Sequence, residues 1–310
     1  MMKPKVTRIL CGLLGLITIS NSGCRAIRHF GEGRQSIAAR RLSGQGFQAM
    51  HDGQWEIAET LFTDALEVST ADDRAHWGLA ESYWKRQETE LAIEQMEQAV
   101  RLSAGDPKMV QRLGHMYLQI GRLQEAESHS LWALETERDS AQAWALRGNY
   151  LKAAGKDDEA LAAYHRALAL QPDYPQVQLQ AAEIYHLNLE YDRLLATLDR
   201  LQDSVGTDAA PARVDVLRGI AMRNHERFEE ARRCFARASI KPDADATAHL
   251  ELASLEMQTG NIPQARASLE VAHQIDPDLV RDGRWMEQLD DHEQRLAKEP
   301  TETPGVPQRR

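Results

Sequence analysis

Small and apolar residues recur along most of this chain at a fixed spacing. From residue 39 onward the same pattern returns every 34 residues, apart from one interval that is three residues longer. Within each segment the apolar positions lie three or four residues apart, which is the spacing of one face of an α-helix. The pattern predicts seven helix–turn–helix repeats, which begin at Ala39, Asp73, Pro107, Ala141, Pro175, Ala212 and Ala246.

The size of the residues follows a rule within the repeat. With the first residue of each repeat counted as position 1, position 8 is Gly or Ala in all seven repeats, and positions 20 and 27 are Ala in six. Position 24 is bulky in six repeats, and Ser130 is the exception. Two helices approach closely only where their side chains are small, and a bulky residue can then fill the space between repeats. We therefore expect positions 8, 20, 24 and 27 to form the core.

The fourth repeat shows the full signature, with Trp, Gly, Gly, Ala, Tyr, Ala and Pro at positions 4, 8, 15, 20, 24, 27 and 32. These residues are Trp144, Gly148, Gly155, Ala160, Tyr164, Ala167 and Pro172. The chain is similar to the tetratricopeptide repeat (TPR) family, whose signature has these residue types at these places. The resemblance implies an all-α fold, a right-handed solenoid of about seven repeats. Gly at position 15, as in Gly53, Gly121, Gly155 and Gly260, is expected to end the first helix in a left-handed conformation.

The repeats are predicted to form two blocks, residues 39–208 and 212–279. The fifth repeat has Leu194 and Leu201 where alanine is the rule, and the segment 203–211 that follows contains the extra residues. Either this region is a bend or softer joint, or the repeat is degenerate and packs normally. Residues 280–298 are predicted to be a charged capping helix with Trp285, Met286 and Leu289 on one side, and residues 299–310 a disordered tail.

The amino terminus has the three zones of an export signal. Lys3, Lys5 and Arg8 precede an apolar run over residues 9–19, and small polar residues follow. Residues 1–23 are therefore predicted to be a signal peptide and residues 24–38 a basic tether. Ser22-Gly23-Cys24 resembles the end of a bacterial lipoprotein signal, which implies lipidation of Cys24 and anchoring in the cell envelope, although Asn21 replaces the usual aliphatic residue. Cleavage after Ser22 would instead release a soluble periplasmic or secreted protein.

Charge and composition limit the chemistry. The net charge is −10, whereas a nucleic-acid partner needs a basic face, so we expect no nucleic-acid binding. The chain has 3 cysteines, which lack metal-ligand spacing, and 11 histidines that form no His-x-x-x-His pair. It contains no phosphate loop and no setting for a nucleophilic serine. We expect no metal, no cofactor and no catalytic residue, and therefore no enzyme.

The family resemblance also implies where a partner binds, namely on the concave surface lined by the first helix of each repeat. Carried over position by position, it places a candidate groove at Arg74, Trp77, Glu81, Trp84, Lys85, Lys108, Gln111, Arg112, His115, Asn149 and Lys152. Two tryptophans flanked by basic residues would suit a peptide with acids and an apolar side chain, because aromatic and arginine residues are favoured anchors at interfaces. Aromatic residues at positions 5 and 12 are alternatively part of the packing.

Two classes of function fit this groove. The first is an exported, membrane-anchored scaffold that binds a partner protein or peptide in an envelope assembly. The second is a module that binds a polysaccharide or a cell-wall fragment, with Trp77 and Trp84 stacked on sugar rings.

Overall fold

The computed structural model describes residues 33–298, and over this range the chain is helical without any strand. The predicted all-α solenoid is confirmed, since consecutive helices pack as pairs. The predicted signal peptide, Cys24, most of the predicted tether and the predicted tail over residues 299–310 lie outside the described residues. Among the helices that are described, none has the length and apolar character needed to cross a membrane.

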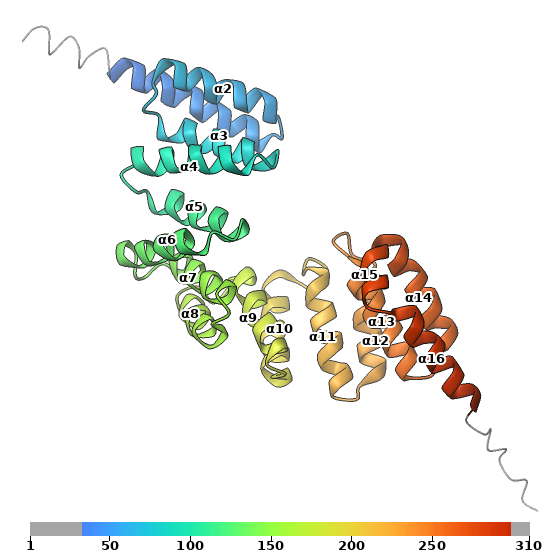
Figure 1. The fold of residues 1–310 in the computed structure, drawn as a ribbon. Coiled ribbons are helices and arrows are strands. Elements are labelled where there is room, and N and C mark those ends of the chain that lie inside the picture. Colours follow the sequence, from blue (N-terminus) through green and yellow to red (C-terminus); the bar gives the residue numbers. More distant parts are fainter. Residues whose placement is uncertain (1–32, 299–310) are drawn as a thin grey trace, which may run out of the picture. The chain divides into compact units, whose positions relative to one another are not determined.

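The described helices belong to two compact units, which meet in sequence between Ala154 and Gly155. In the first unit a helix over residues 33–51 precedes six further helices, drawn from blue to green in Figure 1. Their bounds are α2 Trp55–Val68, α3 Asp73–Lys85, α4 Thr89–Leu102, α5 Pro107–Gln119, α6 Leu123–Thr136 and α7 Ala141–Ala153. Each helix packs on the next one, and α5 also packs on α7, so the first helices of the third and fourth repeats lie side by side.

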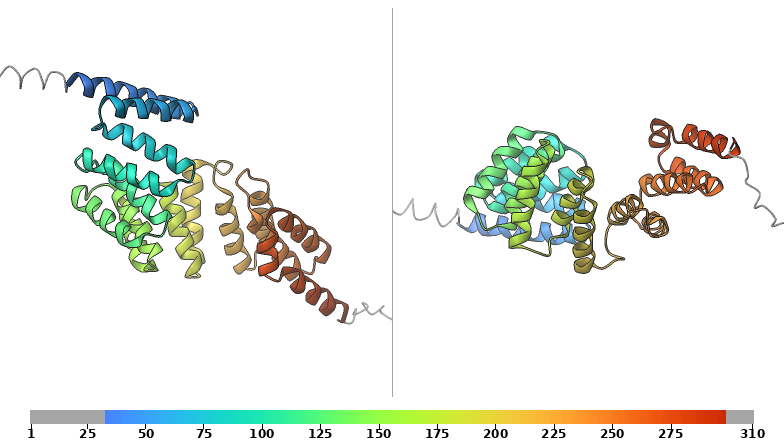
Figure 2. Two further views of the ribbon diagram at one scale, coloured as in Figure 1. Left: turned by 45° about the horizontal axis from the view of Figure 1, so that its top comes forward. Right: turned by 90° about the horizontal axis from the view of Figure 1, so that it is seen from below.

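The second unit continues the same arrangement, as Figure 2 shows for its yellow to red helices. Its bounds are α8 Asp157–Leu170, α9 Pro175–Leu187, α10 Tyr191–Val205, α11 Ala212–Asn224, α12 Phe228–Ser239, α13 Ala246–Gln258, α14 Ile262–Ile275, α15 Pro277–Asp282 and α16 Trp285–Lys298. The contacts of α9 with α11 and of α11 with α13 again join the first helices of successive repeats.

The end of the chain differs from the single capping helix expected over residues 280–298. The helix is interrupted between α15 and α16, because Arg284 has a left-handed backbone with φ 50°. Leu289 is buried and Trp285 packs on the last core cluster, but Met286 is exposed. The interruption lets α16 turn back onto α14, so the cap is a short helix followed by a longer one.

The first helices start where side chains can cap them. The helices α3, α5, α7, α9, α11 and α13 begin at the residues counted above as position 1. The carboxylate of Asp72 accepts hydrogen bonds from the backbone N–H groups of Arg74 and Ala75, at 3.0 and 3.1 Å. Asp106, Ser140 and Asp245 cap α5, α7 and α13 in the same way. These caps satisfy N–H groups that have no partner within the helix, which fixes the start of these four helices. The N-cap residues of α9 and α11 make no such side-chain hydrogen bond.

The core consists of the predicted small and bulky positions. The alanines at positions 20 and 27 are all at most 1% exposed, and the residues at position 24, Ser130 included, are fully buried. A Cβ atom added to Gly46 would lie 2.5 Å from the Phe62 ring, and one added to Gly78 would lie 2.2 Å from it. Phe62 therefore fills the space that two glycines leave. Leu194 and Leu201 are buried like the alanines they replace, so the fifth repeat keeps its core.

The turn at position 15 has a left-handed backbone in every repeat. The four predicted glycines have φ values from 72° to 78°. The other three repeats have Gln87, Leu189 and Glu226 at this position, with φ values of 64°, 60° and 58°. Residues with a Cβ atom adopt this conformation at a cost of about 1–2 kcal/mol. The repeat therefore imposes the conformation whatever residue is present.

The longer segment between the fifth and sixth repeats is tied down by a buried charge cluster. Asp215 is fully buried and accepts hydrogen bonds from Arg237, with an Nη2–Oδ1 distance of 2.6 Å. The Lys241 Nζ lies 2.8 Å from Asp215 Oδ2, and it donates to the carbonyls of Thr207 and Ala210 at 3.0 and 2.5 Å. These contacts hold the segment against the sixth repeat. The predicted softness of this joint remains a prediction.

The glycine contacts predict opposite effects for two neighbouring substitutions in the helix over residues 33–51. Gly46→Ala should lower the free energy of unfolding by about 1–3 kcal/mol, because its Cβ would clash with the buried Phe62 ring. Gly44→Ala is the matched control, because a Cβ there meets nothing within 4 Å. It should raise stability by about 0.5–1 kcal/mol through helix propensity. Urea unfolding followed by circular dichroism measures both, and equal effects of the two substitutions would contradict the packing described.

The charge cluster predicts a large effect of Lys241→Met. The substitution leaves Asp215 buried with one cationic partner fewer and two carbonyls without a donor, so it should cost about 3 kcal/mol of stability. The exposed Lys156, changed to Met, is the control and should shift stability by less than about 0.5 kcal/mol. The same unfolding assay applies. An effect of Lys241→Met no larger than that of the control would show that the cluster does not hold the segment.

Candidate functional site

The predicted groove residues all lie on the first helices of the first unit. We call this set, from α3, α5 and α7, the first-unit groove. Positions 2, 5, 9 and 12 are spaced three or four residues apart, so on each helix they share a face. The structure adds Phe47 from the preceding helix to this set, because its ring contacts Trp77.

Glu81 is the central residue of the groove. Its carboxylate accepts a hydrogen bond from Trp77 Nε1 at 3.0 Å and two from Arg112, at 2.7 Å from Nε and 2.7 Å from Nη2. The Arg112 pairing is bidentate and joins neighbouring repeats, and both side chains are mostly withdrawn from solvent. A bidentate pair fixes orientation as well as charge. Glu81 and Arg112 therefore neutralise each other and hold Trp77 in place.

Aromatic rings and cations surround this pair. The Phe47 ring meets Trp77 edge-on at a centroid distance of 5.7 Å and Phe62 at 5.1 Å. The guanidinium of Arg112 lies 5.7 Å from the centroid of the Trp84 ring, within cation–π range. Trp77 and Trp84 are both half-buried. The tryptophans are thus partly packing residues, although each keeps an exposed part.

Two further cations sit over aromatic rings outside the Glu81 pair. Arg74 lies 5.5 Å above the Phe47 ring, and Lys85 Nζ lies 3.9 Å above the ring of Trp55 at the start of α2. Sequence reasoning missed both rings. Phe47 occupies position 9 of the first repeat, a groove position, so the repeat register contained the signal. Trp55 lies on a second helix, where the family resemblance gave no reason to look.

The remaining predicted residues surround this centre. Lys108 is exposed at the start of α5, and Gln111 and His115 are half-buried on the same helix. Burial, and to a lesser degree the charge of Arg112, lowers the pKa of His115 below its usual value. His115 therefore adds no positive charge near neutral pH. Asn149 and Lys152 are half-buried on α7, one repeat further along the unit.

The balance of charge in the first-unit groove is positive. Glu81 is its one predicted acid, and its charge is balanced by Arg112. Arg74, Lys85 and Lys108 form no ion pair with another residue of the described range 33–298. The second unit has paired charges at equivalent positions, since Arg213 binds Glu183 at 2.8 Å and Arg223 binds Glu251 at 2.7 Å. The unpaired cations therefore distinguish the first-unit groove.

No cluster of three or more His, Cys, Asp or Glu side chains that could hold a metal ion occurs among residues 33–298. Cys234 is buried next to Arg237, and burial raises the pKa of its thiol. The first-unit groove thus combines half-buried aromatic rings, one fixed ion pair and the exposed ammonium groups of Lys85 and Lys108.

Comparison with known proteins gives the family. The model of the tetratricopeptide repeat family matches residues 49–107 and 216–279, and a second model of the same description matches residues 141–184. A human relative, Protein O-mannosyl-transferase TMTC1, is 27% identical over 139 residues, which are 44% of this chain and 16% of that protein. The chain thus spans only a small part of the length of this relative. A tetratricopeptide repeat fold generally serves as a scaffold.

Solved structures show the same fold at low sequence identity. The pilF structure from Pseudomonas aeruginosa has a TM-score of 0.62 and 19% identity, covering 72% of this chain and 99% of that one. A tetratricopeptide repeat protein from Parabacteroides merdae has a TM-score of 0.62 and 11% identity, covering 82% and 99%. The structure of the APC/C hetero-tetramer Cut9–Hcn1 has a TM-score of 0.63 and 15% identity, covering 70% and 42%. By its repeats and its fold, the chain belongs to the tetratricopeptide repeat family.

Proposed function

We propose that the chain is an interaction scaffold that binds a partner peptide in the first-unit groove. The observation that carries the proposal is the arrangement around Glu81. Glu81 holds Trp77 by a hydrogen bond and binds Arg112, which in turn lies over the ring of Trp84. The same set of residues contains cations that have no acidic partner. Residues already held in place lose little conformational freedom when a ligand binds. This groove is therefore prepared for binding before a partner arrives.

The partner chemistry follows from what the groove leaves unsatisfied. Arg74, Lys85 and Lys108 would pair with carboxylates, whereas Arg112 already has its counter-ion in Glu81. The exposed parts of the two tryptophans would contact an apolar side chain. An acidic peptide segment with an apolar anchor fits both features, and the formation of a hetero-tetramer by Cut9–Hcn1, a structure of similar fold, supports a scaffold role.

The contacts of the tryptophans favour a peptide over a polysaccharide. A sugar ring would stack on an open indole face. Here Arg112 lies over the Trp84 ring, and Phe47 packs against Trp77. A peptide can use the remaining ring edges together with the ammonium groups of Lys85 and Lys108.

We further propose that the protein is exported and anchored in the bacterial cell envelope through a lipid on Cys24, as part of an envelope assembly. The support is the order of basic, apolar and small polar zones over residues 1–23 and the Ser22-Gly23-Cys24 end. Arginines in the tether 24–38 would add attraction to anionic headgroups.

The groove is tested by charge reversal at its rim. Lys85→Glu combined with Lys108→Glu should weaken partner binding at least about ten-fold, because two attractive contacts become repulsive while both side chains are exposed. Trp84→Ala should weaken it by a similar or larger factor as the loss of an aromatic anchor. The measurement is quantitative affinity purification of the tagged full-length protein from its native membranes. The control is Lys156→Glu, an exposed lysine of the second unit. Unchanged recovery of the partner with both groove variants would contradict the groove.

The lipid anchor has its own test. Cys24→Ser should abolish incorporation of labelled palmitate and move the protein from the membrane to the soluble fraction. Cys234→Ser is the matched control, because that thiol is buried in the sixth repeat and should leave acylation unchanged. Acylation of the Cys24→Ser protein at the wild-type level would exclude the anchor and leave the groove proposal untouched.

A further inference from the structure

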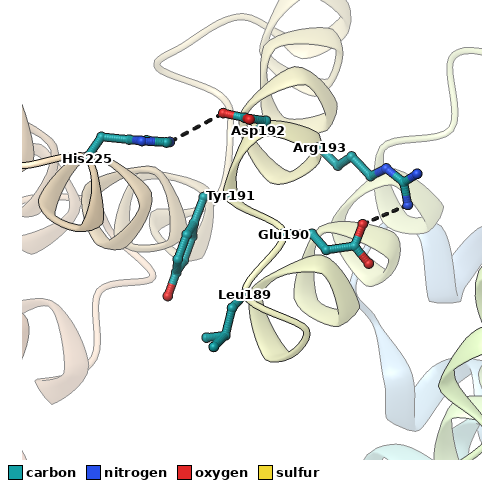
Figure 3. A pocket seen from close by; sticks show the side chains of 6 residues that line it. All are labelled: Leu189, Glu190, Tyr191, Asp192, Arg193 and His225. Carbon is teal, nitrogen blue, oxygen red and sulfur yellow. Dashed lines mark hydrogen bonds and ion pairs between the residues drawn. The ribbon is translucent and has the colours of Figure 1, made fainter.

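A second surface feature lies in the second unit, at the turns of the fifth and sixth repeats. Leu189, Glu190, Tyr191, Asp192, Arg193 and His225 line a pocket of about 450 Å3 there (Figure 3). Leu189 and Glu190 lie in the turn between α9 and α10, Tyr191, Asp192 and Arg193 begin α10, and His225 follows α11. The pocket is therefore built by two neighbouring repeats of the second unit.

Contacts within the pocket hold its walls in place. The Tyr191 ring meets the His225 ring edge-on, at a centroid distance of 6.3 Å. His225 Nε2 lies 3.5 Å from Asp192 Oδ1, and Arg193 Nη1 lies 2.7 Å from Glu190 Oε2. Figure 3 shows both pairs of side chains pointing toward each other. The aromatic wall of Tyr191 is thus fixed by the neighbouring repeat.

Leu189 is the residue that the fold does not explain. It has a left-handed backbone, with φ 60°, at the position where four repeats have glycine and two have a polar residue. Its side chain is 66% exposed, and that of Leu187 is 62% exposed. An exposed leucine gains nothing from burial that could offset the cost of a left-handed backbone. The turn imposes this backbone on any residue, so what sets Leu189 apart is an exposed apolar side chain where the other repeats without glycine have Gln87 and Glu226.

The charge at the rim indicates the occupant. The Asp192 side chain is 96% exposed, and Glu226 is exposed on the adjoining turn. Glu190 and Arg193 balance each other. The pocket therefore combines an exposed leucine and a tyrosine ring with the exposed carboxylate of Asp192, and its two acids outnumber its one arginine, the reverse of the charge in the first-unit groove.

We propose that this turn pocket is a second docking site, which takes an aliphatic or aromatic side chain of a partner protein flanked by Lys or Arg. The apolar side chain would contact Leu189 and Tyr191. The flanking cation would pair with Asp192. The site is independent of the first-unit groove, so a single molecule could hold two segments of opposite charge.

The test uses a random dodecapeptide library displayed on phage and the full-length protein. Peptides retained by the wild-type protein but not by Leu189→Gly should be enriched in Leu, Phe or Trp next to Lys or Arg. Glycine relieves the backbone strain at this position, so the variant removes the side chain while folding at least as stably. If Leu189→Gly loses binding while its Tm is unchanged or higher, the loss comes from the docking site and not from unfolding of the protein.

Three variants then define the site with one enriched peptide. Leu189→Gly should weaken binding at least ten-fold, and Asp192→Asn should weaken it several-fold and reduce its salt dependence. Gln87→Gly is the matched control, because it relieves the same backbone conformation in the first unit and should leave affinity unchanged. Enrichment of acidic peptides, or equal affinity for wild type and Leu189→Gly, would overturn the proposal. Self-association that is lost in Leu189→Gly would overturn it as well, because a second copy would then cover the surface.

Discussion

The structure depends on the close approach of helices at small side chains. Positions 20 and 27 carry fully buried alanines in six repeats, and position 24 supplies a bulky residue between them. Gly46 and Gly78 show how narrow the tolerance is, because the Phe62 ring lies where a methyl group at either glycine would be. Because repeats bury their apolar faces against their neighbours, these contacts couple the repeats within each unit.

This constraint explains why the sequence predicted the helices so well. The starts of four first helices follow from caps such as Asp72 and Ser140, and helix pairing follows from the alanines that recur in six repeats. Both signals are local. Departures from the pattern were harder to interpret. Leu194 and Leu201 left open whether the fifth repeat is a softer joint or a degenerate repeat that packs normally, and both side chains are buried in the core. The neighbouring side chains in the folded protein decide whether a larger residue fits. The repeat period of the sequence does not identify these neighbours.

The candidate site was predictable in its place but not in its charges. The repeat register identified the face of α3 and α5, and Phe47 was missed although it occupies a groove position. The pairing of Glu81 with Arg112 was not visible, because it joins residues 31 apart that meet only after stacking. Arg213 with Glu183 and Arg223 with Glu251 follow the same plan. Such ion pairs bind one repeat to the next. The charges available to a partner are therefore those of the side chains that form no ion pair between repeats.

The repeat also separates positions that the fold controls from positions left to function. At position 15 the backbone is left-handed in all seven repeats, although its residue varies from glycine to Gln87, Leu189 and Glu226. The conformation comes from the turn between packed helices, and its cost is met by the stack on either side. The side chain at that point is therefore free to change without loss of the fold. An exposed leucine with a left-handed backbone can persist there at a modest cost to stability. Because the side chain at position 15 can vary, the turns resemble the groove faces of the first helices. At both places, binding residues can be added to an otherwise fixed scaffold.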